Sequence, residues 1–365
     1  MADNDRYPML ADLRRQATCL ATLAQRLPEF ASVGRARLKS EGIVAFGSGD
    51  GWFAARAAAA YAQQDLGLPY EAASSLETLS YVLPRNPNRR LAGIAISMSG
   101  SADRTNEAAE ALRTADKPVL ALTNGNGGEL ARITGEKISL GVPDLAPFLT
   151  GTTKYTATLL GLVMLLEGAA EAKRSLLIPH LSALPRLLTD AERFSQEFAD
   201  RYVGSPPTGV RVLSAGVNLA TADYGMAKLI KLLPLPVWSD DVEEFAHRQF
   251  WSCPATDLMI YIATNPAVAR CASASAAALG SMGMMTVAID TPSTPVTGAR
   301  ARFTLPDVPE NVSPLFASIP LQFLGYYLAL AFGANPDQSQ EVGDPARFHA
   351  AQLLARRGEL ETAKS

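Results

Sequence analysis

The sequence predicts an α/β protein built from two similar units, each a parallel sheet flanked by helices. Short, continuously apolar runs alternate with helical segments, which is typical of parallel sheets buried on both faces. The order of strand, glycine turn and helix then occurs a second time at a nearly constant offset. The matched strand ends are Gly47 and Gly216, Ser97 and Thr264, and Ala121 and Ala288. The length of 365 residues agrees with two domains.

The first half begins with an amphipathic helix and continues with four strands. Leucine and alanine recur on one face between Pro8 and Leu27, which predicts a helix there. The predicted strands are the apolar runs 42–46, 91–96, 118–122 and 136–140. The predicted helices are 52–64, 105–114 and the long apolar segment 155–170, which is too short to span a bilayer comfortably.

The second half repeats this alternation. The predicted strands are 210–214, 257–262 and 284–289, and the predicted helices are 221–232 and 268–279. The apolar segment 315–332 carries Pro320 and Gln322, so we interpret it as a buried helix. We expect an N-terminal helix over 1–30, the two units over 31–185 and 200–335, and a C-terminal tail over 336–365, with a linker near 181–207.

The composition argues against several classes of protein. Hydrophobic residues make up 48% and charged residues 19%, which excludes a disordered chain. The formal charge of −3 argues against nucleic acid as a partner. Cys19, Cys253 and Cys271 show neither metal-ligand nor disulfide spacing, and the N-terminus has no signal-peptide pattern. We therefore expect a cytoplasmic protein without a metal site or a membrane partner.

Clusters of hydroxyls and glycine follow the predicted strands of the first half. Their members are Gly47, Ser48 and Gly49, then Ser97, Ser99 and Ser101, then the stretch around Thr152. Ligands of open α/β sheets bind at the carboxyl ends of the strands, and helix N-termini there favour anions. Any one cluster is also explained as an ordinary cap or turn. Three clusters on one edge predict a ligand site.

Four motifs together resemble the paired sugar isomerase (SIS) domains. They are Gly47-Ser48-Gly49, Ser97-Met98-Ser99-Gly100, Thr152-Thr153-Lys154 and Glu244-Phe245-Ala246-His247. The likeness is greatest to the isomerase half of glutamine–fructose-6-phosphate aminotransferase and to the fructosamine-phosphate deglycases, and it extends to about Asp337. It implies flavodoxin-like three-layer units, no glutaminase domain or amidotransferase activity, no cofactor, and a homodimer with shared active sites.

The resemblance also implies roles for individual residues. Ser48, Ser97, Ser99 and Thr152 would hold a sugar or sugar phosphate, with Gly47, Gly49, Ser101 and Lys228 beside them. His247 would open the sugar ring, reaching the site from the neighbouring subunit, and an imidazole suits proton transfer near neutral pH.

The sequence departs from the family pattern in both halves of the implied site. Gly49 stands where a hydroxyl is usual, Met98 replaces a glutamine and Ala102 replaces a threonine, while Asp50 lies close by. The position of the family's catalytic glutamate is Lys231, and the stretch 337–344 contains no Schiff-base lysine. The sequence is therefore also compatible with a substrate that is a sugar derivative without a phosphate.

These departures leave alternatives. Lys231 is either a base or imine-forming amine made reactive by burial near Lys228, or a surface lysine. Glu244 either orients His247 or replaces the missing base, whereas Glu243 is interpreted as part of a solvated acidic loop. The two functions that follow are a sugar isomerase or aminosugar-adduct lyase, and a non-catalytic sugar-binding or regulatory protein.

Overall fold

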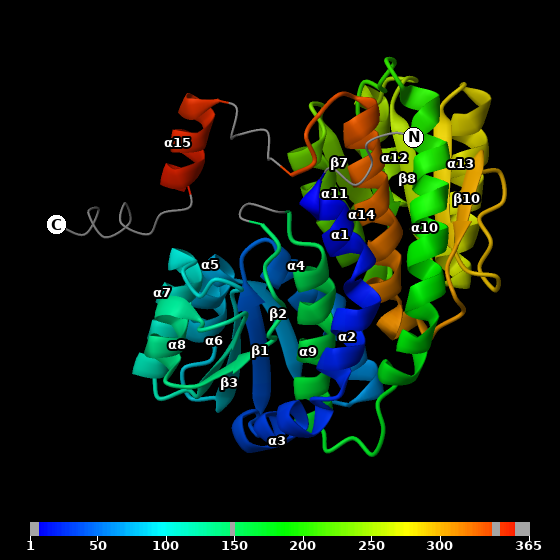
Figure 1. Cartoon of the computed structure of the whole chain (residues 1–365). Helices are drawn as coiled ribbons and strands as arrows, with labels where there is room; N and C mark the ends of the chain where they lie inside the picture. Colours follow the sequence, from blue (N-terminus) through cyan, green and yellow to red (C-terminus); the bar gives the residue numbers. More distant parts are fainter. Residues whose placement is uncertain (1–6, 147–149, 338–343, 355–365) are drawn as a thin grey trace. The chain divides into compact units, whose positions relative to one another are not determined.

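The computed structural model describes residues 7–146, 150–337 and 344–354 (Figure 1). The chain divides into two compact units that are not continuous in sequence. The first-sheet unit comprises Thr18–Asp144, Thr153–Pro179 and Glu341–Ser365, and the second-sheet unit comprises Met1–Ala17, Leu145–Thr152 and His180–Gln340. The N-terminal segment, expected to be a separate helix, thus begins within the second-sheet unit.

Each unit contains a five-stranded parallel sheet. The first has the order β2-β1-β3-β4-β5, with β1 (Gly42–Gly47), β2 (Tyr70–Ser74), β3 (Leu91–Ile96), β4 (Val119–Thr123) and β5 (Lys137–Ser139). The second has the order β10-β9-β8-β6-β7, with β6 (Val210–Ser214), β7 (Val237–Asp241), β8 (Leu258–Ala263), β9 (Met285–Asp290) and β10 (Ala301–Thr304). Counted from each unit's own first strand, the two orders are identical, which confirms the predicted α/β class and its duplication.

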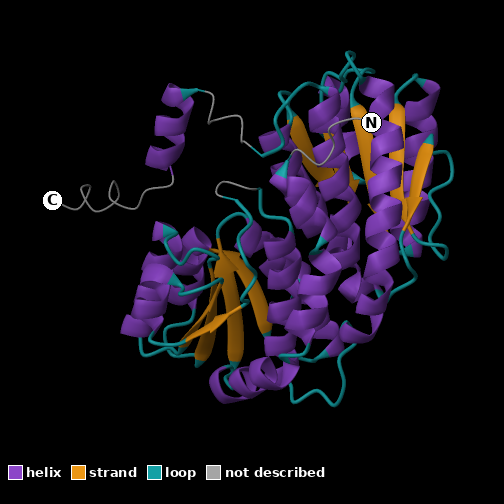
Figure 2. Cartoon of the chain, in the orientation of Figure 1, coloured by secondary structure: helices purple, strands orange, loops and turns teal. Residues whose placement is uncertain are grey.

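Helices surround both sheets (Figure 2). The first-sheet unit contains α3 (Leu27–Arg37), α4 (Asp50–Ala57), α7 (Asp103–Thr114), α8 (Gly128–Thr134) and α9 (Thr153–Ala169), with the short α5 (Ser75–Glu77) and α6 (Leu83–Arg85). The second-sheet unit contains α1 (Pro8–Arg14), α10 (Leu184–Ala199), α11 (Leu219–Leu232), α12 (Glu244–His247), α13 (Pro266–Ser281) and α14 (Ser313–Ala331). The helix α2 (Gln16–Ala24) follows α1, and α15 (Pro345–Leu354) lies near the C-terminus. The central strands β1, β3, β6 and β8 are buried along their whole length, as continuous apolar runs require.

Two predictions about the helices were wrong in detail. The N-terminal helix is divided into α1 and α2, and the unpredicted α3 starts a new helix whose first turn contains Pro28. The expected linker contains α10, which packs on α14. Pro185 lies in the first turn of α10, where the missing N–H costs nothing, so it marks a helix start rather than a linker.

The apolar helix α14 is part of the core. Among the described residues, only the stretch Glu310–Ala331 is long and apolar enough to cross a membrane, and 89% of its most apolar window is buried inside the protein. Gln322 in this helix accepts a hydrogen bond from Gln16 at 2.9 Å and donates to the Tyr224 hydroxyl at 2.8 Å. These buried partners satisfy the amide inside the apolar core, so the predicted buried helix is confirmed.

Candidate functional site

The first candidate site lies where β1 and β3 end. These neighbouring parallel strands finish at Gly47 and Ile96, which face each other in register. The chain leaves β1 toward α4 and leaves β3 toward α7, and β2 lies on the other side of β1, so the strand order reverses here. Such a switch point is where open α/β sheets bind ligands. A Cβ on Gly47 would lie 2.7 Å from the Ile96 carbonyl oxygen, so the two loops approach too closely for a side chain.

The loop from Ser97 to Ser101 offers two exposed hydroxyls. Ser97 itself is buried, and its Oγ accepts a hydrogen bond from the Gly100 N–H at 3.2 Å. Ser99 and Ser101 are exposed, with their Oγ atoms 2.8 Å apart. Gly100 has a φ of +68°, and a Cβ there would lie 1.8 Å from the Gly127 carbonyl oxygen. Ser97 therefore shapes the loop, whereas Ser99 and Ser101 are available to a ligand.

Behind the exposed Ser48 lie two buried hydroxyls that the sequence analysis missed. Ser48 Oγ donates to Ser75 Oγ at 3.4 Å, and Ser75 Oγ lies 2.9 Å from Thr105 Oγ1. Ser75 follows β2, which was not predicted as a strand, and Thr105 lies within a predicted helix. A serine pair directly before a helical segment, Ser74-Ser75, was the signal that could have found the first of them.

The equivalent edge of the second sheet is closed by the protein itself. Asn218, after β6, donates to Thr264 Oγ1 and to Ser313 Oγ, both at 2.8 Å. Its side-chain oxygen Oδ1 accepts from Thr221 Oγ1 at 2.9 Å. Asn218 and Ser313 are buried. Asn218 and Ser313 are thus buried and hydrogen-bonded to each other and to their neighbours, whereas Ser99 and Ser101, although hydrogen-bonded to each other, are exposed to solvent.

The predicted catalytic histidine lies in the second-sheet unit. His247 is the last residue of α12 and its side chain is 66% exposed. Its Nε2 lies 3.9 Å from Glu243 Oε1, while the other oxygen of Glu243 accepts from Cys271 Sγ at 3.3 Å. Burial, followed by the Glu243 carboxylate, raises the pKa of Cys271 to about 11, so the thiol stays protonated. Glu243 is 70% exposed, which agrees with its interpretation from the sequence as a solvated residue, and its carboxylate approaches the imidazole. Glu244 is also exposed, and its backbone N–H donates to Asp241 at 3.3 Å.

The loop that follows His247 is tied to the second sheet. Arg248 forms an ion pair with the buried Asp240, and Gln249 Nε2 donates to the Ser239 carbonyl at 3.1 Å. Gln249 Oε1 accepts from Arg211 at 2.7 Å, and Arg211 forms a buried ion pair with Asp257 at 3.1 Å. These contacts fix the backbone beside His247 while leaving the imidazole exposed.

The two lysines of α11 differ in burial. Lys228 is 1% exposed, and its Nζ lies 5.1 Å from the centroid of the Tyr224 ring. Lys231, in the last turn, is exposed. Lys231 is therefore not buried as expected, because the buried amine on this helix is Lys228, and a role of Lys231 in proton transfer stays a prediction.

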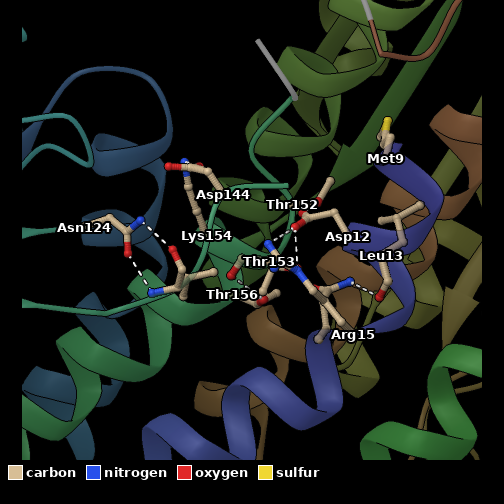
Figure 3. Close-up of polar contacts among 12 residues, drawn as sticks. Met9, Asp12, Leu13, Arg15, Asn124, Asp144, Thr152, Thr153, Lys154 and Thr156 are labelled. Carbon is tan, nitrogen blue, oxygen red and sulfur yellow. Dashed lines mark hydrogen bonds and ion pairs between the residues drawn. The ribbon is translucent and has the colours of Figure 1, made fainter. Parts of the chain in front are cut away.

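Thr152 lies in the second-sheet unit with its hydroxyl engaged (Figure 3). It is 1% exposed and donates to the carboxylate of Asp12, whose other oxygen accepts from Arg15 Nε at 3.0 Å. In the first-sheet unit, Lys154 pairs with Asp144. The Thr152 hydroxyl thus donates its hydrogen to the carboxylate of Asp12, and a contact between Thr152 and a substrate stays a prediction.

Comparisons with known proteins agree with this architecture. No family model matches the sequence. The isomerising glutamine–fructose-6-phosphate aminotransferase of Caldanaerobacter subterraneus subsp. tengcongensis is 24% identical over 273 residues, covering 71% of this chain; the chain spans 44% of that relative's length. The C-terminal domain of glucosamine-fructose-6-phosphate aminotransferase from Francisella tularensis has a TM-score of 0.71 at 15% identity, covering 92% of this chain and all of that chain.

Two further solved structures have similar scores. Glucosamine-6-phosphate deaminase from Thermotoga maritima has a TM-score of 0.74 at 14% identity, covering 91% of this chain and 97% of the other. Tagatose-6-phosphate ketose/aldose isomerase from Escherichia coli has a TM-score of 0.71 at 17% identity, covering 90% of this chain and 94% of the other. The chain has the paired SIS fold. The resemblance seen in the sequence, to the isomerase half of the aminotransferase, is thereby confirmed at the level of the fold.

Three of the departures from the SIS pattern, Gly49, Met98 and Ala102, lie in the loops at the edge of the first sheet. Gly49 precedes α4 with a φ of +55°, and Ala102 precedes α7, so neither helix has a side-chain cap. Met98 is half-buried, and its sulfur accepts a hydrogen bond from Thr158 Oγ1 at 3.4 Å. Three positions of the loops are thus without a hydroxyl or amide that could face a ligand. The described residues contain no group of three or more His, Cys, Asp or Glu side chains suited to a metal ion.

Proposed function

We propose that the chain is an enzyme that binds a sugar derivative at the carboxyl edge of the first sheet. It would isomerise that sugar, or cleave an aminosugar adduct, through the ring-opened carbonyl. The observation that carries this proposal is the pair of loops after β1 and β3, which expose Ser48, Ser99 and Ser101 at the switch point. The relatives named above support it, because they are a fructose-6-phosphate aminotransferase, a glucosamine-6-phosphate deaminase and a tagatose-6-phosphate ketose/aldose isomerase.

The proposed chemistry needs ring opening and a proton transfer between neighbouring carbons. His247 is assigned to ring opening, because an imidazole exchanges protons near neutral pH and this one is exposed. We propose that it acts on the partner subunit's sugar in a homodimer with shared sites. Glu244 or Lys231, both exposed, is assigned to the second proton.

A ligand screen followed by a turnover assay tests this proposal. Sugars and sugar phosphates that raise the melting temperature are incubated with the protein, and conversion is followed by NMR. We expect His247→Ala to abolish turnover while binding persists, and His180→Ala, the control, to leave both unchanged. Unchanged turnover in His247→Ala would remove His247 from the mechanism, and the absence of any stabilising sugar would contradict the proposed function.

A non-catalytic sugar-binding or regulatory role is the second candidate. It is favoured by Lys231, an exposed amine at the position where the resemblance places a catalytic carboxylate. A sugar that stabilises the protein and is never converted under the same assay would support this role over the enzyme.

A further inference from the structure

The connection from β7 to β8 carries His247 and then returns across the second sheet. β7 ends at Asp241 and β8 begins at Leu258, and the two strands are parallel, so the chain must come back from the carboxyl edge to the amino edge. It does so through α12, the short turn Gln249–Ser252 and the loop before β8. His247 is the last residue of α12, so it lies where this return begins.

The two residues that follow His247 are bound to successive positions of β7. Arg248 forms an ion pair with the carboxylate of Asp240, which is 7% exposed. Gln249 Nε2 donates to the backbone carbonyl of Ser239 at 3.1 Å. The chain after His247 therefore runs antiparallel along the end of β7, and a shift along the strand would break both contacts.

Gln249 is also bound to a buried cation. Its Oε1 accepts a hydrogen bond from Arg211 Nη1 at 2.7 Å. The Arg211 side chain is 3% exposed, its Nε donates to Asp257 at 3.1 Å, and its guanidinium carbon lies 4.2 Å from the centroid of the Trp238 ring. Arg211 is thus held on three sides, and both ends of the Gln249 amide are attached to fixed parts of the second sheet.

Two aromatic rings close the turn that contains His247. Phe245 is 2% exposed and belongs to a core cluster of the second-sheet unit, and Phe250 packs against the same cluster. The ring centroids are 6.3 Å apart and the rings meet edge to face. The residues between these rings thus form a turn with a buried base, whereas the His247 side chain is 66% exposed.

We propose that Gln249 is a positioning residue for His247, because it fixes the turn that presents the imidazole. The inference rests on the proposed function for the role of His247, and it adds a residue that acts through His247 without touching the sugar. A displacement of about 1 Å can cost about a hundredfold in rate. The sugar is proposed to bind at the edge of the first sheet, so loss of Gln249 should lower kcat and leave KM unchanged.

Turnover kinetics and amide hydrogen exchange of the full chain test the inference together. Gln249→Met removes both hydrogen bonds and keeps a side chain of similar length. We expect its kcat to fall about tenfold to a hundredfold at unchanged KM, and the amides of residues 247–252 to exchange faster. Gln196→Met, at an exposed position of α10, is the matched control and should change neither quantity. Gln249→Glu keeps an oxygen acceptor for Arg211, so its kcat should lie between those of Gln249→Met and the wild type.

The possible outcomes separate this inference from the proposed function. Faster exchange with an unchanged kcat would overturn the inference, because the turn would then be held without any effect on His247. A lower kcat with unchanged exchange, or equal losses in Gln249→Glu and Gln249→Met, would overturn it as well, since the contact with Arg211 would not be what fixes the turn. If the wild type converts no sugar, the proposed function fails, and hydrogen exchange alone decides whether Gln249 fixes the turn around His247.

Discussion

One buried carboxylate, Glu167, makes the folding stability of this protein depend on pH. Glu167 on α9 is 4% exposed and accepts a hydrogen bond from the Tyr61 hydroxyl at 2.6 Å. Burial raises the pKa of Glu167 above its usual value, although the hydrogen bonds from Tyr61 and Ser175 oppose the rise. The folded state therefore retains this proton to a higher pH than the unfolded chain, and the stability it contributes at low pH is lost as pH rises through the folded-state pKa.

Glu167→Gln is expected to stabilise the protein at neutral pH. The amide oxygen can still accept from Tyr61, and the cost of burying a charge is removed, which is worth about 1 kcal/mol for each unit of pKa shift. Thermal unfolding at pH 4.5 and pH 7.5 checks this, with the exposed Glu110→Gln as the control. We expect a higher melting temperature at pH 7.5 and little change at pH 4.5. Equal destabilisation at both values would show that the carboxylate itself is needed.

At the scale of elements, the sequence predicted the buried strands well and the edge strands poorly. The central strands β1, β3, β6 and β8 are continuously apolar, so their positions were correct to within a residue or two. The missed strands β2, β7 and β10 lie at sheet edges and contain charged or polar residues, as in the sequence Val-Trp-Ser-Asp-Asp of β7. An edge strand is partly solvated and needs no continuous apolar run, so periodicity alone does not identify it.

The site could be predicted only where it depends on local sequence. The loops after β1 and β3 were located from their glycines and serines, because turn chemistry is local. The exposure of Lys231 and the burial of Lys228 depend on how α11 packs against its neighbours, and no local pattern encodes that packing. The approach of Glu243 to His247 is a local contact between residues four apart, which the sequence analysis passed over in favour of Glu244. The sequence identified residue types near the site but not which of them are buried.

The loop that carries Ser99 should depend on Gly100 for two separate reasons. Gly100→Ala places a Cβ against the Gly127 carbonyl and also forces a side chain into positive φ. Gly125→Ala is the matched control, because Gly125 also has positive φ, at +70°, but no atom lies within 4 Å of its Cβ position. We expect Gly125→Ala to cost about 1 kcal/mol and Gly100→Ala distinctly more. Chemical denaturation of both variants measures this, and equal losses would mean that the close approach is relieved at no cost.

At the scale of the whole molecule, two units with one topology have diverged at the same place. Both sheets have a switch point between their first and third strands. In the first-sheet unit this edge exposes Ser48, Ser99 and Ser101, whereas in the second-sheet unit Asn218 joins Thr264 to Ser313. Each sheet therefore has one edge at which a ligand could bind. The edge of the second sheet is occupied by hydrogen bonds within the protein, so only the edge of the first sheet exposes hydroxyls to a ligand. We therefore expect one sugar site per chain.

Asn218→Ala tests this division between a ligand site and a structural one. The variant leaves Thr264 and Ser313 without the amide donor and Thr221 without its acceptor, at a cost of about 1–3 kcal/mol for a buried polar group left unsatisfied. We expect a clear loss of unfolding free energy in chemical denaturation, and an unchanged stoichiometry and affinity for the sugar in calorimetry. Thr221→Val, which removes only one of the three bonds, should cost less. A variant that keeps its stability and loses sugar binding would place the ligand at the second sheet instead of the first.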